Sequence, residues 1–231
     1  MRAITRAELE QAIVRNCAPT FAALKPASLF TFPGAFVSGG SADEQEHVAQ
    51  NRAILSQIMR ACCEKLQASG IKLRILVWRP CGALIYVYRP DMLTAHLSDE
   101  RAEVPLREQG YPLEDLDACL DTLAQRIADA GKQAITNAEA VPEAHGCPCD
   151  NDSCRREFPH ELGYFLGYPY ADVAEFIHQH GENYLEFGMW KIYTERERAL
   201  ETFARYKRCT RSMMRAYRRR GRLEGLAVRV R

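Results

Sequence analysis

The pattern of apolar and polar positions predicts a chain that mixes helices with a small sheet. Apolar residues recur at helical spacing over residues 48–66 and 113–127, as in amphipathic helices. Residues 71–78 alternate with a period of two, and a second strand-like segment follows at 83–89 after a turn-like Arg79-Pro80-Cys81-Gly82 sequence. We therefore expect an α+β fold, in which a small antiparallel or mixed sheet containing the 71–89 hairpin packs against several helices.

Capping and helix-breaking residues set the expected ends of these helices. The sequence Ser41-Ala42-Asp43-Glu44 matches a capping box, and Gly70 is expected to end the helix that it opens. Gly131 is expected to end the helix over 113–127. Pro105 is expected to interrupt the segment that precedes this helix. Further expected elements are a helix over residues 6–16, a helix with Pro159 in its first turn, a small hairpin around Gly188 and a last helix from about Glu195.

Length and composition are those of an ordinary globular protein. The chain has 231 residues, of which 47% are hydrophobic and 26% charged, and this is enough to bury one good core or two small ones. We expect a single α+β domain over residues 1–210, with a flexible cysteine-containing insert near 137–157 and a basic helical tail over 211–231. No apolar run reaches the length of a membrane span, and the first residues lack the apolar core of a signal peptide. The expected location is therefore the cytoplasm.

A net charge of +1 hides a strong asymmetry. The segment from Arg205 to Arg231 is rich in arginine but contains one acid, Glu224, whereas the rest of the chain is acidic. Such a segment can bind a polyanion, end a helix in solvent or dock on the acidic body of its own chain. Because no groove-reading motif and no series of stacking aromatic residues accompanies the charge, the pattern disfavours nucleic acid as a partner.

Nine cysteines are many for a chain without an export signal, and we expect reduced thiols rather than a disulfide framework. Cys147, Cys149 and Cys154 form the most metal-like group, because three thiolates in a polar loop can bind zinc or an iron–sulfur cluster. Their spacing matches no standard finger. The alternative is an exposed insert with oxidisable thiols.

Two further places carry reactive side chains. Cys17 lies where a helix is expected to end, and as a thiolate beside a positive neighbour such as Lys25 it would be a nucleophile or ligand. The alternative is a small buried hydrophobic residue.

His160 and Glu161 lie near a helix N-terminus and are candidates for a general base or acid, or for an axial imidazole ligand. Neighbouring helical positions point about 100° apart, so both do not face one small substrate squarely.

Several standard catalytic motifs are missing from the sequence. It contains no G-x-x-x-x-G-K loop, no G-x-G-x-x-G after a strand, no H-E-x-x-H and no G-x-S-x-G. These absences disfavour four activities: nucleotide hydrolysis, dinucleotide redox chemistry, zinc proteolysis and serine esterase activity.

Three stretches carry a family resemblance: residues 17–30, residues 158–169, and residues 188–193 followed by Phe203, Tyr206 and Cys209. Together they resemble the signature of a bacterial family of unknown function (domain of unknown function 3793), found mainly in anaerobes. The resemblance implies an association with flavodoxin and with iron or haem uptake. It directs attention to residues within these stretches and the segment just before the third. The candidate ligand-binding residues are Thr20, Lys25, Ser28, Asn183, Trp190, Lys191 and Tyr193.

Three functional hypotheses stay open at this point, and the sequence leaves open whether the protein is an enzyme. The leading one is a cytosolic accessory protein that binds iron, haem or a related redox cofactor, with His160 and Cys17 as candidate ligands. The second is an enzyme with Cys17 as nucleophile, His160 as base and Glu161 beside it. The third is an interaction module that uses the arginine-rich last helix against an acidic, flavodoxin-like partner.

Overall fold

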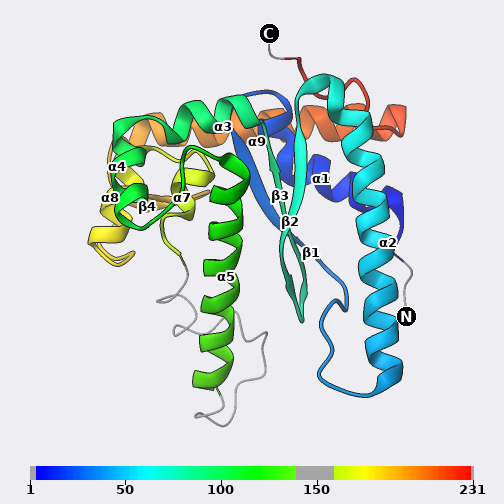
Figure 1. Ribbon diagram of the computed structural model, residues 1–231. Helices are drawn as coiled ribbons and strands as arrows, with labels where there is room; N and C mark the ends of the chain where they lie inside the picture. Colours follow the sequence, from blue (N-terminus) through cyan, green and yellow to red (C-terminus); the bar gives the residue numbers. More distant parts are fainter. Residues whose placement is uncertain (1–3, 139–158, 230–231) are drawn as a thin grey trace. The chain divides into compact units, whose positions relative to one another are not determined.

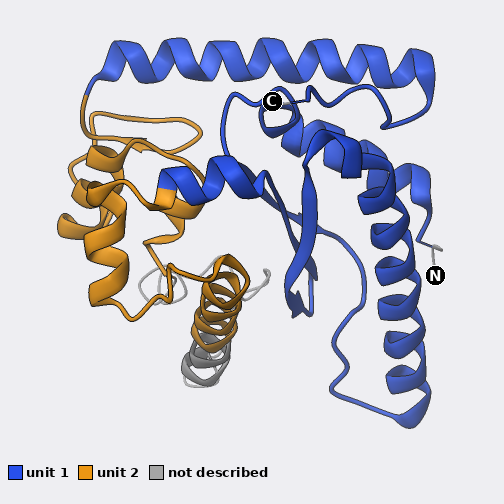
Figure 2. Ribbon diagram, turned by 45° about the horizontal axis from the view of Figure 1, so that its top comes forward, with its two compact units in different colours: residues 1–96, 195–231 blue, residues 97–194 orange. Residues whose placement is uncertain are grey.

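The computed structural model describes residues 4–138 and 159–229, and these belong to two compact units (Figures 1 and 2). Unit 1 comprises Met1–His96 and Glu195–Arg231, and unit 2 comprises Leu97–Thr194. The mixture of helices with a small antiparallel sheet confirms the expected α+β class. Two compact units are compatible with one folding domain or with two, so the single domain stays a prediction. Nearly all of the expected insert at 137–157 lies outside the described residues.

Unit 1 contains a three-stranded antiparallel sheet formed by β1 (Ala27–Phe32), β2 (Lys72–Arg79) and β3 (Gly82–Tyr88). The order is β1-β3-β2, which confirms the expected hairpin and makes β3 the central strand (Figure 1). Every residue of β3 is buried. At the hairpin, Gly82 has φ +152°, and a Cβ there would collide with the carbonyl oxygen of Phe32, so this position requires glycine.

Three long helices build the core of unit 1: α1 (Arg6–Phe21), α2 (Ala42–Leu66) and α9 (Arg196–Arg220). Helix α1 packs on β1 and β3, α9 packs on α1, and α2 packs on β2. The short helices η1 (Gln67–Ser69) and α3 (Pro90–Leu97) precede and follow the hairpin. The apolar stripe predicted for α2 is confirmed, because its members are all buried: Val48, Leu55, Met59, Cys62 and Leu66.

Helix α1 corrects one predicted boundary. The sequence predicted a helix over 6–16, but α1 continues through Pro19 to Phe21. Proline removes one backbone hydrogen bond from a helix and clashes with the preceding turn. Here all five residues from Cys17 to Phe21 are buried, and the apolar contact of this last turn outweighs that loss.

Arg89 joins the end of α1 to two other segments of unit 1. Its guanidinium group donates to the carbonyl oxygens of Thr20, Phe21, Ser69 and Val228 at 2.7–2.8 Å. Only 3% of Arg89 is exposed, and burial lowers its pKa. The amide of Val228 donates in turn to the carbonyl oxygen of Phe21. The last described residues are therefore fastened to the core rather than extending from it.

The segment after α9 differs from the expected helical tail. Helix α9 ends at Arg220, where Gly221 adopts a left-handed conformation. Leu223 and Leu226 then return to the hydrophobic core of unit 1. The segment over 211–231 is thus basic in its helical part and apolar where it closes the core.

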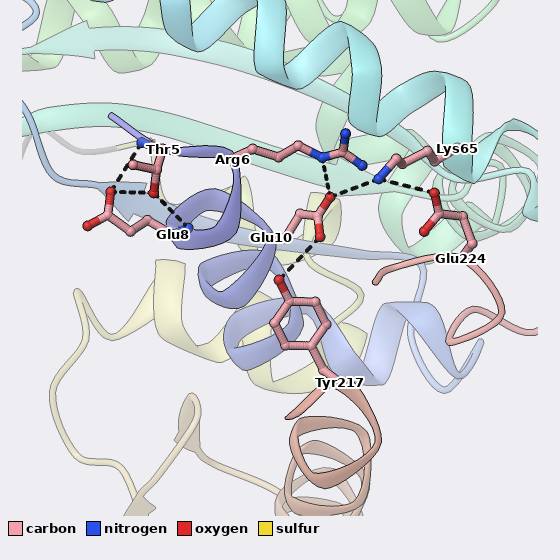
Figure 3. A network of polar contacts seen from close by, with 7 residues as sticks. All are labelled: Thr5, Arg6, Glu8, Glu10, Lys65, Tyr217 and Glu224. Atoms are coloured by element: carbon pink, nitrogen blue, oxygen red, sulfur yellow. Dashed lines mark hydrogen bonds and ion pairs between the residues drawn. The ribbon is translucent and has the colours of Figure 1, made fainter. Parts of the chain in front are cut away.

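A buried carboxylate, Glu10, holds three elements of unit 1 together (Figure 3). Its Oε1 accepts from Arg6 Nε at 2.8 Å and from Lys65 Nζ at 3.1 Å, and its Oε2 accepts from the hydroxyl of Tyr217 at 3.2 Å. Lys65 also pairs with Glu224 at 3.1 Å. Because Glu10 is 3% exposed, these donors replace the water that a carboxylate would otherwise bind.

Unit 2 consists of short helices, one long helix and a small hairpin. Its helices are α4 (Glu100–Glu108), α5 (Leu116–Ala138), α7 (Leu162–Phe165) and α8 (Tyr170–His178). Strands β4 (Glu186–Phe187) and β5 (Lys191–Ile192) form the hairpin predicted around Gly188. No helix among the described residues combines the length and the apolar character of a membrane span.

Two predicted helix ends in unit 2 are wrong. Pro105 lies inside α4 rather than interrupting it, and α5 continues past Gly131 to Ala138. Glycine inside a helix costs only about 1 kcal/mol relative to alanine. This small cost does not end α5, whose backbone stays helical through Gly131 to Ala138.

Candidate functional site

A pocket of about 230 Å³ lies within unit 2, between α7, α8 and the hairpin. Its walls are mainly apolar and aromatic, and four of its lining side chains carry titratable groups: His160, Tyr168, Asp172 and Lys191. Three of the residues predicted from the sequence line it: His160, Trp190 and Lys191. Gly163 permits the close packing of α7 on α8, because a Cβ there would lie 2.7 Å from Val173 Cγ2.

Asp172 fixes the aromatic wall of the pocket. The indole N–H of Trp190 donates to Oδ2 of Asp172 at 2.8 Å. Oδ1 accepts from the backbone amides of Tyr193 and Thr194, and also from the Thr194 hydroxyl, at 2.9–3.0 Å. The ring of Tyr168 packs 5.1 Å from that of Trp190. A single carboxylate thus anchors the end of β5 and holds the indole in place.

His160 presents a neutral imidazole to the pocket. It is half-buried, and its ring centre lies 5.1 Å from that of Phe176 in an edge-to-face arrangement. Burial lowers the pKa of His160, the nearby Glu161 opposes this, and His180 adds to the lowering. In the part of the chain that the structure describes, the two ring nitrogens make no hydrogen bond. A neutral imidazole in this position can accept or donate one hydrogen bond, or ligate a metal ion.

Glu161 faces a different direction from His160. Its Oε1 accepts from the Tyr111 hydroxyl at 2.9 Å and from Arg126 Nη1 at 3.0 Å. The buried carboxylate and the surrounding apolar groups raise the pKa of Tyr111 well above its usual value. Glu161 does not line the pocket. The two neighbours therefore do different work: His160 faces the cavity, and Glu161 holds α5 and the loop before it.

Lys191 supplies the positive charge of the pocket. Its Nζ donates to the carbonyl oxygen of Gly181 at 2.5 Å and lies 4.6 Å from the ring centre of Tyr184 and 5.7 Å from that of Phe176. Within the described ranges it has no carboxylate partner. An ammonium group carries three N–H donors, so donors remain for a ligand.

The other two residues predicted on this hairpin do not line the pocket. Asn183 is exposed and adopts φ +55°, a left-handed conformation that asparagine tolerates. The hydroxyl of Tyr193 is buried and has no hydrogen-bond partner among the described residues, and burial raises its pKa. These two residues shape the hairpin beside the cavity.

The remaining predicted residues form a separate group in unit 1, here named the Cys17 cluster: Cys17, Thr20, Lys25 and Ser28. The hydroxyls of Thr20 and Ser28 hydrogen-bond at 2.8 Å and join α1 to β1. Burial lowers the pKa of Lys25 to about 8, whereas the adjacent Cys17 favours its charged form. Structurally, the cluster fastens the last turn of α1 to the first strand.

Cys17 itself is fully buried in the hydrophobic core of unit 1. Burial raises the pKa of its thiol far above the usual range, although Lys25 and Ser28 act in the opposite direction. A nucleophilic cysteine must be a thiolate that the substrate can reach. The burial of Cys17 therefore argues against a nucleophilic role, and His160 belongs to the other unit.

The predicted metal-binding group cannot be described in the same way. Cys147, Cys149 and Cys154 lie outside the described residues. Among residues 4–138 and 159–229, no three or more His, Cys, Asp or Glu side chains are placed to hold a metal ion together.

Comparison with protein families places both sites in a known group. A family described as Protein of unknown function (DUF3793) matches residues 13–227. The chain belongs to this family. The matched residues 13–227 include the Cys17 cluster and every residue that lines the pocket. Searches of curated proteins and of solved structures found no match.

Sequence reasoning selected three of the twelve residues that line the DUF3793 pocket, and four of those it missed carry polar or aromatic side chains: Tyr168, Asp172, Phe176 and Phe187. Asp172 is the most important of them, but an acid in the first turn of a helix is common on exposed surfaces, where it favours the helix dipole. The three aromatic residues were a usable signal, because with Trp190 they place four aromatic rings within a stretch of 23 residues, from 168 to 190.

Proposed function

We propose that this member of the DUF3793 family binds a small planar organic anion in the pocket of unit 2. The observation that carries the proposal is the placement of one cation, Lys191, and one neutral imidazole, His160, at the wall of a mainly apolar and aromatic cavity. Binding sites for small molecules are typically apolar clefts with a few converging polar groups.

The charges of the pocket favour an anionic group on the ligand. Lys191 has no carboxylate partner within the described residues and keeps donors for a carboxylate or similar group. Asp172 does not repel such a ligand strongly, because Trp190, Tyr193 and Thr194 already occupy its oxygens. A charge-assisted hydrogen bond from Lys191 contributes about 1.5 kcal/mol or more to binding.

The volume of the pocket limits the size of the ligand. At about 230 Å³ the cavity is smaller than the roughly 300–1,000 Å³ of sites for drug-sized molecules. A ligand of one or two rings fits this space between Phe176, Phe187 and Trp190. Haem is larger, and its binding would require the pocket to open.

This proposal refines the leading hypothesis from the sequence, an accessory protein of the cytoplasm that binds a redox cofactor. In that hypothesis the cofactor is iron or haem, and the partner is a flavodoxin-like redox protein. An iron or haem version uses the imidazole of His160 as ligand. Haem added to the purified protein should then give a saturable Soret shift that His160→Ala weakens and His178→Ala does not. An absent shift rules out haem and leaves the small-anion proposal standing.

The main experiment uses three ring compounds of equal size and different charge: benzoate, benzamide and benzylamine. The chain has two tryptophans. The indole N–H resonance of Trp190 reports binding in the pocket, and the resonance of Trp78, in unit 1, is the internal reference. Benzoate should shift the Trp190 resonance saturably and bind about tenfold more tightly than benzamide. Benzylamine should bind most weakly.

Two variants separate charge from space. Lys191→Met should remove the preference for benzoate over benzamide, whereas Lys72→Met, at an exposed lysine of unit 1, should keep it. Gly163→Ala should weaken all three compounds, because the added methyl group pushes against Val173 and narrows the pocket. An unchanged preference in Lys191→Met, or no shift with any compound, would overturn the proposal.

A further inference from the structure

The second half of α9 and the turn after it expose an unusual run of cations. The nine exposed basic residues are Arg205, Lys207, Arg208, Arg211, Arg215, Arg218, Arg219, Arg220 and Arg222, here named the arginine stripe. No acid lies between Glu201 and Glu224. Eight of the nine are arginines, whose planar guanidinium groups bind phosphate through two hydrogen bonds at once.

None of these cations is neutralised by the described part of the chain. No residue of the arginine stripe forms an ion pair with a described carboxylate. The nearby acids are engaged elsewhere, because Glu10 binds Arg6 and Lys65, and Glu224 binds Lys65 (Figure 3). Docking of the stripe on the chain's own acids, which the sequence left open, is therefore not observed in the described residues.

The stripe has a regular geometry. Arg208, Arg211, Arg215 and Arg218 follow one another at intervals of three and four, so they lie along one side of α9 over about 15 Å. The apolar side of the same helix packs into unit 1, where Phe203 and Tyr206 are buried. The cations thus form a linear array on a helix that the core holds in place.

We propose that the arginine stripe binds the phosphodiester backbone of a nucleic acid without reading its base sequence. Duplex DNA carries one negative charge per about 1.7 Å of its axis, and a linear array of cations neutralises several phosphates together. Interfaces with nucleic acid are strongly basic and polar, as this surface is. The missing groove-reading motif, which made the sequence disfavour nucleic acid, excludes readout of base edges but not contacts to the backbone alone.

Two other classes of polyanion fit this surface less well. A helix that binds a membrane inserts an apolar face, and the apolar face of α9 is buried in the core of unit 1. Protein interfaces are anchored by a centre of aromatic and apolar side chains. From 205 to 222 every exposed residue is Arg, Lys, Ser or Gly, so the stripe offers no such centre.

The test measures binding of the full chain to a fluorescently labelled 16-base-pair DNA duplex between 50 and 200 mM salt. The logarithm of affinity should fall with that of salt with a slope of about −3 to −4, because each neutralised phosphate contributes about −0.9. A duplex of different base sequence should bind equally. An RNA duplex of the same sequence shows which nucleic acid the array matches better.

The decisive variant replaces Arg211, Arg215 and Arg218 by glutamine. It should weaken binding at least about tenfold at 50 mM salt and reduce the slope by about 2 to 3, while the free energy of unfolding stays unchanged. The matched control replaces the exposed Arg15, Arg60 and Lys72 of unit 1 by glutamine and loses the same net charge. Its binding should stay close to that of the wild type.

Several outcomes would overturn the proposal. They are no binding at 50 mM salt, an equal loss in both triple variants, and strong dependence on base sequence. Binding to phosphatidylserine vesicles or to polyglutamate, but not to either duplex, would assign the stripe to a membrane or to an acidic protein instead. These measurements do not involve the pocket of unit 2, so they are independent of the proposed function.

Discussion

The indole nitrogen of Trp190 lies 2.8 Å from Oδ2 of Asp172, and both side chains are buried. This one hydrogen bond links α8 to the start of β5, 18 residues later in the chain. Asp172, in the first turn of the short helix α8, therefore fixes the position of an aromatic side chain of the pocket wall. The shape of the pocket therefore depends on Asp172, whose carboxylate accepts hydrogen bonds from Trp190 and from the backbone of Tyr193 and Thr194.

Replacing Asp172 by asparagine should destabilise the hairpin. The amide cannot accept on both sides, so at least one of the donors from Trp190, Tyr193 and Thr194 loses its partner. We expect the free energy of unfolding in urea to fall by about 1–3 kcal/mol. Asp43→Asn, at an exposed position of α2, is the control and should change it by less than about 0.5 kcal/mol. Equal values for both variants would contradict the anchoring role.

His160 should give the protein a component of stability that is lost in mild acid. Burial makes its pKa lower in the folded chain than in the unfolded chain, where it is about 6.5. Between these two values the unfolded chain binds the proton more readily, so stability decreases as the pH falls from 6.5 toward the folded pKa. Above 6.5 this component is present in full.

The measurement is the free energy of unfolding at pH 7.5 and at pH 5. His160→Gln should lose less stability than the wild type over this range. His178→Gln, at a side chain that is 84% exposed, should behave as the wild type does. If all three proteins lose the same amount, the imidazole of His160 is not held neutral by its surroundings.

The thiol of Cys17 should resist alkylation in the native protein. Iodoacetamide reacts with thiolates, and burial both hides Cys17 and raises its pKa. At pH 8, peptide mass spectrometry should find Cys81, which is exposed, modified while Cys17 remains intact. Both should react fully in guanidinium chloride. Rapid modification of native Cys17 would show that the core opens there and would restore the nucleophile hypothesis.

Removing the charge of Glu10 should destabilise unit 1. In Glu10→Gln the buried site keeps the donors of Arg6, Lys65 and Tyr217 but loses the negative charge that they surround. We expect a loss of about 1–3 kcal/mol in the free energy of unfolding. Glu64→Gln, an exposed position of α2, should change it little. A loss as small as that of Glu64→Gln would show that the charge of Glu10 is not needed.

The sequence predicted best those elements whose periodicity decides their structure. The stripe of α2 and the hairpin of β2 and β3 need no information from distant residues, because helical spacing marks the first and two apolar runs around a turn mark the second. The errors fall at Pro19, Pro105 and Gly131, which the structure keeps inside helices. At Pro19 and Pro105, buried residues in the same turn outweigh the local preference against proline. The sequence alone does not reveal which residues will be buried.

The candidate sites were predicted only in part for a related reason. His160, Trp190 and Lys191 were found because their side chains carry chemistry, and these three line the pocket. Cys17 was chosen on the same ground, but the core of unit 1 encloses it. Exposure depends on long-range packing, and so the sequence could not tell a reactive thiol from a buried one.

Unit 1 is built from two stretches of chain separated by about one hundred residues of unit 2. On the ribosome, residues 1–96 emerge while α9, Leu223 and Leu226, which complete their core, have not yet been synthesised. Unit 2 is contiguous and can close as soon as residue 194 has left the exit tunnel. The apolar surfaces of α1 and of the sheet therefore stay partly uncovered during translation until residues 195–226 have emerged, and in this interval the nascent chain is more prone to aggregate.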